Sequence, residues 1–289
     1  LKTNPNYAGV YYNLGIMFKE LEEYQKAIGY YEKAIQIDPN YAQAHHNLGI
    51  VFKESGELQK AITCFQKAIH IQPNYASAHN NLGLAFIKLR EYQKAISCFQ
   101  KAIQLNPNHA SAHSNLGIVL KQLGEHQKAM GCYEKAIKIK PNYAIAYNNL
   151  GAVLKELGMF RESVNACEKA LIIQPDNLGA YHNLALSLQE LNEIKKAINC
   201  YKILSKVQTN PGNAYQNLGK LSVMIGEKKE AINFYQLAIK HEPENLFYYY
   251  SLSDIDKNIL DENLKVKINN IIKKNKGNNK NMAYANFLL

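Results

Sequence analysis

The stretch that decides the fold is residues 42–75, AQAHHNLGIVFKESGELQKAITCFQKAIHIQPNY. Apolar residues at 48, 51 and 52 recur at intervals of three and four, which predicts one stripe along a first helix. Ser55-Gly56 ends that helix, because glycine readily takes the left-handed conformation of a C-terminal cap. A second stripe runs from Ala61 to Ile69. Pro73 stops the second helix, since it lacks a backbone N–H and disfavours helix in the residue before it. The stretch therefore predicts a helix-turn-helix unit.

The same unit recurs along the chain with a period of 34 residues. The eight prolines stand at 5, 39, 73, 107, 141, 175, 211 and 243. The first five gaps are 34 residues, and the last two are 36 and 32, which together make two periods. Fixed self-similarity of this length predicts a solenoid of stacked units rather than a compact domain.

Small residues recur at fixed positions of each unit when Ala8 is counted as position 1. Position 8 is Gly or Ala, position 20 is Ala or Ser, and position 27 is Ala except for Leu204. This pattern resembles the tetratricopeptide repeat, with seven repeats over residues 8–245. The resemblance implies an all-α fold, a right-handed superhelical solenoid of 34-residue helix-turn-helix repeats. Repeat six is the least regular, so we expect a packing irregularity between repeats six and seven.

The two ends of the chain depart from the pattern. Residues 1–7 parallel residues 35–41, which predicts the end of a truncated upstream repeat. Residues 246–289 are expected to form a degenerate eighth repeat and C-terminal helices, cut before a further domain.

Composition excludes several classes of protein. A hydrophobic fraction of 47% with 20% charged residues rules out a disordered chain. No apolar run approaches ~18 residues, so no membrane partner is expected. The net charge is +10, but seven of the lysines crowd into residues 257–280 and only two residues are arginine. Because Arg is the usual residue for bidentate phosphate and base contacts, we expect no nucleic acid partner.

The sequence carries no sign of catalysis or of a cofactor. It has no Gly-rich phosphate loop, no His-Glu-x-x-His and no Gly-x-Ser-x-Gly, so this fragment is not expected to be an enzyme. The five cysteines form no Cys-x-x-Cys pair, and an odd number favours a reducing, cytoplasmic compartment.

The cysteines and histidines fall at repeat positions and have two interpretations each. The cysteines lie on second helices and could form a redox or metal ladder, or could be small apolar residues in a helix interface; we favour the second. The histidines at position 4 could ligate a metal, but residues one repeat apart do not converge on one ion. We expect them to pack where tyrosine stands in other repeats. The residues concerned are Cys64, Cys98, Cys132, Cys167, Cys200, His45, His79 and His113.

Asparagine stands at position 6 of all seven repeats. It is a mediocre helix former, so local preference does not explain it. In the tetratricopeptide fold this position faces the concave groove, where an amide offers two donors and an acceptor to an extended peptide backbone. Alternatively, the amides bond to neighbouring helices and set the superhelix, or recent duplication copied them. We favour groove recognition, because solenoids tend to bind partners along their concave face. The variation at the neighbouring position 5 argues against duplication alone. The Asn ladder consists of Asn13, Asn47, Asn81, Asn115, Asn149, Asn183 and Asn217.

Four lysines share position 12, beside this Asn ladder: Lys19, Lys53, Lys121 and Lys155. They could add a positive stripe for acidic peptide segments. Equally, they could be solvated residues that complement the helix dipole. The clamp that binds chaperone C-termini needs Lys at position 5, which no repeat has.

These observations favour a protein-interaction scaffold that binds extended or disordered protein segments in its groove. An alternative is the substrate-recruiting arm of a larger transferase. The Asn ladder with NLG following is similar to the arm of protein O-linked N-acetylglucosamine transferases, and residues 246–289 resemble the junction in bacterial tetratricopeptide-sulfotransferase proteins. A purely architectural spacer would need no Asn at position 6. Uncapped ends also predict self-association of arrays.

Overall fold

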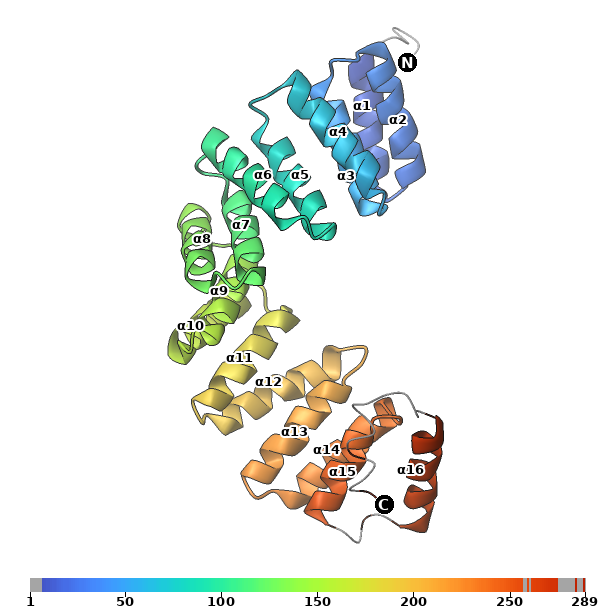
Figure 1. Cartoon of the computed structure of the whole chain (residues 1–289), viewed down its shortest axis with the longest axis vertical. Coiled ribbons are helices and arrows are strands. Elements are labelled where there is room, and N and C mark those ends of the chain that lie inside the picture. Colours follow the sequence, from blue (N-terminus) through green and yellow to red (C-terminus); the bar gives the residue numbers. More distant parts are fainter. Residues whose placement is uncertain (1–6, 257–258, 260, 275–283, 285–287, 289) are drawn as a thin grey trace. The chain divides into compact units, whose positions relative to one another are not determined.

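The computed structural model describes residues 7–256, 259, 261–274, 284 and 288. Sixteen α-helices and no strand occur in this described part, which confirms the predicted all-α class (Figure 1). The helices are α1 Ala8–Glu20, α2 Tyr24–Ile37, α3 Ala42–Glu54, α4 Leu58–Ile71, α5 Ala76–Lys88, α6 Tyr92–Leu105, α7 Ala110–Gln122, α8 His126–Ile139, α9 Ala144–Glu156, α10 Phe160–Ile173, α11 Leu178–Glu190, α12 Ile194–Val207, α13 Gly212–Met224, α14 Lys228–His241, α15 Leu246–Ile255 and α16 Glu262–Lys274. None of them combines the length and apolar content needed to cross a membrane.

The chain divides into two compact units, residues 1–149 (unit 1) and residues 150–289 (unit 2). In unit 1, α3, α5 and α7 each contact the second helix of their own repeat and the second helix of the repeat before. The same holds in unit 2 for α11 and α13. Neighbour-to-neighbour packing of this kind is how a solenoid builds its core.

The contact inside five of the seven repeats depends on a glycine facing a ring; repeat five has Cys167 in place of the ring, and repeat six has Ala185 in place of the glycine. A methyl group added at Gly83, position 8 of repeat three, would lie 2.6 Å from the Phe99 ring at position 24. Gly15 and Tyr31 form the same contact in repeat one, at 2.5 Å. Phe99 and Tyr31 are fully buried. The two helices therefore approach closely because position 8 has no side chain and position 24 fills the space it leaves.

The turn between the two helices has a positive φ at position 15 of all seven repeats. Glycine occupies this position in four repeats, and Gly56 has a φ of 85°. Glu22, Arg90 and Asn192 stand there in the other three, with φ of 57°, 60° and 58°. The glycine that marks the turn in residues 42–75 therefore correctly locates the helix end, and the turn conformation persists where glycine is replaced.

Two further helices follow repeat seven. Ile268 and Ile271 of α16 pack with Leu246 and Tyr249 of α15 and with Leu288. The interpretation of residues 1–7 as the end of an upstream repeat falls almost wholly outside the described residues. So does most of the segment after Lys274. The domain boundaries given above stay predictions.

Candidate functional site

In unit 1, three of the predicted Asn residues bond to the repeat before their own. Asn47 Nδ2 donates to the Tyr12 hydroxyl at 3.0 Å. Asn81 Nδ2 lies 2.8 Å from His46 Nε2, and Asn115 Nδ2 donates to Asn80 Oδ1 at 3.0 Å. Each bond joins position 6 of one repeat to position 5 of the preceding one. These Asn side chains therefore connect adjacent first helices.

Position 5 varies in identity but keeps one chemical property at these joints. Tyr12, His46 and Asn80 share no shape, yet each presents an oxygen or nitrogen that accepts a hydrogen bond. The residues at position 5 therefore vary in shape, but at these three joints each supplies a hydrogen-bond acceptor. Sequence reasoning missed this pairing, and the signal was available: all seven position-5 residues are polar.

The hydrogen bonds between repeats use only part of the donor and acceptor capacity of each amide. Asn81 and Asn115 are half-buried, and each takes part in one hydrogen bond among the described residues. One N–H and the carbonyl oxygen of each amide stay available. A structural role and a binding role are therefore compatible at the same residue.

The remaining members of the Asn ladder differ. Asn13 is exposed, whereas Asn149, Asn183 and Asn217 are half-buried. Asn217 donates to the backbone carbonyl of Asn213 at 2.9 Å, within its own helix. The ladder therefore does not repeat one bond throughout the described chain.

The predicted lysine stripe gains a member in unit 1. Lys53 is half-buried, and partial burial lowers the pKa of its ammonium group, with nearby Lys88 and Lys19 adding to the effect against Glu54. Lys88 Nζ also donates to the Lys53 carbonyl at 3.3 Å. Lys88 stands at position 13, one position after the place of the other lysines, so the repeat pattern did not include it. Lys19, Lys53 and Lys88 form the cluster that we call the lysine cluster.

Of the other predicted lysines, Lys121 and Lys155 are half-buried in α7 and α9. Their membership of the stripe stays a prediction from the sequence. Within unit 1, the structure places Lys19 and Lys88 close enough to Lys53 to affect its charge.

The comparison with known families follows from this repeated geometry. A family model of the cilia and flagella-associated protein 70 C-terminal domain matches residues 7–211, which is most of the chain. A model of the tetratricopeptide repeat matches residues 212–245. The chain is a tetratricopeptide-repeat protein of this family. No curated protein sequence matches it.

Solved tetratricopeptide-like structures share the fold. The crystal structure of MamA protein matches with 32% identity and a TM-score of 0.51, covering 60% of this chain and 94% of that chain. The PilF structure of Pseudomonas aeruginosa matches with 21% identity and a TM-score of 0.64, covering 70% of this chain and 91% of that one. PilW, a type IV pilus biogenesis factor, matches with 18% identity and a TM-score of 0.64, covering 69% and 93%. The last two similarities show the fold alone.

The position-4 histidines have a defined role in the tetratricopeptide repeats. The Nε2 atoms of His45, His79 and His113 lie 3.1, 3.2 and 3.1 Å from the carbonyl oxygens of the prolines six residues before them. Tyr249 donates its hydroxyl to the Pro243 carbonyl at 3.0 Å in the corresponding place. The expectation that these histidines pack where tyrosine stands elsewhere is confirmed, and the bond to the proline carbonyl adds its reason. No group of three or more potential metal ligands gathers among the described residues.

The cysteines of the tetratricopeptide repeats are free thiols. Burial raises the pKa of Cys64 and of Cys98 to about 11, and that of Cys167 to about 12. Such thiols carry almost no thiolate at neutral pH and are poor nucleophiles. This agrees with packing, the interpretation favoured from the sequence.

Proposed function

We propose that this protein is a non-catalytic scaffold that binds extended segments of partner proteins on the face lined by its first helices. The proposal rests on the Asn ladder of unit 1, whose amides use only part of their hydrogen-bonding capacity within the protein. Asn81 and Asn115 each keep a donor and an acceptor after bonding to the neighbouring repeat. An extended backbone presents the complementary acceptor and donor at every residue.

We further propose that unit 1 prefers acidic segments. The Lys53 ammonium group is partly dehydrated and is repelled by Lys19 and Lys88, which is why its pKa is lowered. A carboxylate placed among the three would relieve that repulsion and replace lost water. The lysine cluster therefore supports an anionic partner, whereas isolated, fully solvated lysines would not.

The resemblance to transferase arms stays a prediction from the sequence, because no family or structure reported above bears on it. A recruiting arm would use the same face in the same way. The binding experiment below is therefore informative for either kind of parent protein.

The test is a binding measurement with an array of extended peptides that differ in acidic content. The triple variant Lys19→Gln, Lys53→Gln, Lys88→Gln should weaken the binding of acidic peptides by about tenfold or more, and salt should weaken wild-type binding. The matched control is Lys67→Gln, Lys101→Gln, Lys135→Gln, which removes the same charge from exposed sites on second helices. Equal losses in both triples would refute the acidic preference, and an array without binders would refute the scaffold itself.

A further inference from the structure

Repeat two, residues 42–75, shows how a joint between first helices is closed. His46, at position 5, lies between three side chains. The Tyr75 hydroxyl is 3.2 Å from Nδ1, with ring centroids 4.8 Å apart. Asn81 Nδ2 is 2.8 Å from Nε2, and the Phe65 ring lies 5.8 Å away. Both nitrogens of the imidazole are engaged, and Tyr75 covers it.

The ring that covers position 5 stands at position 34, the last residue of each repeat. The first repeat has the same arrangement: the ring centroid of Tyr41 lies 4.9 Å from that of Tyr12. Tyr41 and Tyr75 both follow a Pro-Asn pair, in the sequences DPNY and QPNY. The covering tyrosine is thus tied to a proline two residues before it.

Repeat six, residues 178–211, has the same histidine without its cover. Its last four residues read QTNP, so proline has moved from position 32 to position 34 and no tyrosine is present. His182 keeps the neighbouring ring, Tyr201, at 6.4 Å. It has no hydrogen bond to any described residue, because Asn217 donates to the Asn213 carbonyl instead. Both partners that hold His46 are therefore missing at His182.

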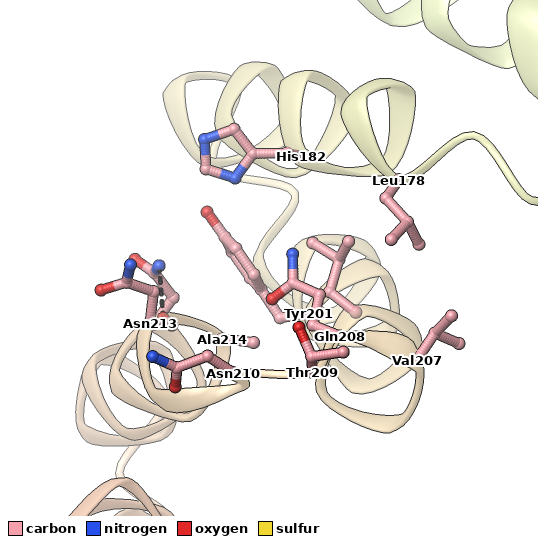
Figure 2. A pocket seen from close by; sticks show the side chains of 11 residues that line it. Leu178, His182, Tyr201, Val207, Gln208, Thr209, Asn210, Asn213 and Ala214 are labelled. Atoms are coloured by element: carbon pink, nitrogen blue, oxygen red, sulfur yellow. Dashed lines mark hydrogen bonds between the residues drawn. The ribbon is translucent and has the colours of Figure 1, made fainter. Parts of the chain in front are cut away.

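A pocket of about 550 Å³ lies beside His182 and Tyr201, between α11, α12 and α13 (Figure 2). Leu204 and Val207 contribute apolar surface, and the amides of Asn210 and Asn213 lie along the side opposite His182. None of the lining residues is an acid, a lysine or an arginine. The volume is in the range of ordinary ligand sites, and the lining combines apolar surface with a few polar groups. The pocket lies between repeats six and seven, where the sequence predicts a packing irregularity.

We propose that the pocket binds a tyrosine side chain of a partner protein, in the manner of Tyr75 on His46. This deepens the proposed function and rests on it for the nature of the ligand. The phenol ring would pack against the imidazole and the Tyr201 ring, where aromatic pairs are favourable. Its hydroxyl would bond to the free imidazole, while the amides at the rim would meet the backbone of the segment.

The charge state of the histidine suits a phenol. Partial burial, with Lys155 nearby, lowers the pKa of His182. At neutral pH the ring is therefore uncharged and offers one nitrogen as an acceptor for the phenol O–H. No lysine or arginine lines the pocket, so a carboxylate-bearing side chain would find no direct ion-pair partner there, unlike at the lysine cluster of unit 1.

The first experiment uses N-acetyl-tyrosine amide as the probe and the His182 ring signals in a ¹H–¹³C NMR spectrum as the reporter. The His182→Phe variant assigns those signals by their loss. We expect the tyrosine probe to shift them, and to bind about threefold more tightly than N-acetyl-phenylalanine amide, which lacks the hydroxyl. In His182→Phe, followed through the Val207 methyl signals, the preference for tyrosine should vanish.

The second experiment restores the missing cover. The double variant Thr209→Pro, Pro211→Tyr rebuilds the sequence QPNY found at residues 72–75. Its own tyrosine should fill the pocket, shift the His182 signals without any probe, and abolish probe binding. The matched control, Asp176→Tyr, adds a tyrosine at an exposed site of the preceding linker and should leave probe binding unchanged.

Two results would overturn the pocket proposal: His182 signals that no probe moves, or probe binding that survives in a folded QPNY variant. In either case, peptides without tyrosine that still bind to the first-helix face would leave the proposed function standing. Conversely, a probe that shifts His182 in a protein to which no peptide binds would support the pocket and refute the scaffold.

Discussion

At the scale of single residues, the packing of most repeats depends on the absence of a side chain at position 8. Gly83→Ala would place a methyl group 2.6 Å from the Phe99 ring, closer than such atoms approach. We expect a loss of about 1–3 kcal/mol in the free energy of unfolding, measured by urea denaturation. Gly131→Ala is the control: it lies in α8 with nothing within 4 Å, so better helix propensity should stabilise the protein by up to about 1 kcal/mol. Equal effects of the two substitutions would contradict this account of position 8.

His46 predicts a dependence of stability on pH. Burial lowers its pKa from 6.5 to about 4. Protonation is therefore disfavoured in the folded state, so its contribution is complete above pH ~6.5 and is lost as the pH falls toward 4. The loss at this site is at most about 3 kcal/mol. Since His45, His79 and His109 also have lowered pKa values, the measurement is a difference between variants.

The comparison variant is His46→Asn, which keeps an acceptor, as Asn80 does in the next repeat, but does not titrate. Denaturation at pH 7 and pH 4.5 should show the wild type losing more stability than the variant. An identical loss would mean that His46 carries its proton in the folded protein without penalty.

At the scale of helices, the position-5 residue of α7, like His182 of α11, lacks the hydrogen bond that Tyr12, His46 and Asn80 accept among the described residues. The Ser114 hydroxyl at position 5 is buried and has no hydrogen-bond partner among the described residues, although Asn149 stands at position 6 of the next repeat. Serine is shorter than the tyrosine, histidine or asparagine that accepts at other joints. Ser114→Asn should restore the bond and stabilise the protein by about 0.5–1.5 kcal/mol in thermal denaturation.

Ser114→Ala separates this explanation from a hidden role of the hydroxyl. Removing an unpaired polar group should cost nothing or stabilise slightly. A clear destabilisation by alanine would show that the hydroxyl has a partner, and the asparagine prediction would then lose its basis.

Much of the element structure could be predicted because proline and glycine act locally. Pro73 and Gly56 end helices through their own backbone geometry, so position in the sequence is enough. The partner of Asn81 could not be found this way. It depends on how far one repeat rotates against the next, which no single repeat specifies. The sequence predicted a packing irregularity near His182 but not a pocket, because the pocket depends on the absence of a tyrosine and not on the presence of a particular residue.

At the scale of the molecule, stability is local, because each repeat contacts only its neighbours within a unit. Gly83→Ala should therefore speed amide hydrogen exchange in α5, α6 and the helices that pack on them. Exchange in α13 and α14 of unit 2 should stay at the wild-type rate. Hydrogen–deuterium exchange with mass spectrometry of peptic fragments measures both, and a uniform increase would show that the two units unfold as one.

The joint between repeats also bears on how such a chain can change its length. The donor is constant, whereas the acceptor is a phenol oxygen, an imidazole nitrogen or an amide oxygen. Deleting residues 76–109, one whole period, would bring Asn115 to the place of Asn81, and His46 would accept from it as before. Unequal recombination between repeats within a gene therefore yields arrays whose joints are already complementary, and natural selection can act on the number of repeats without first repairing their contacts.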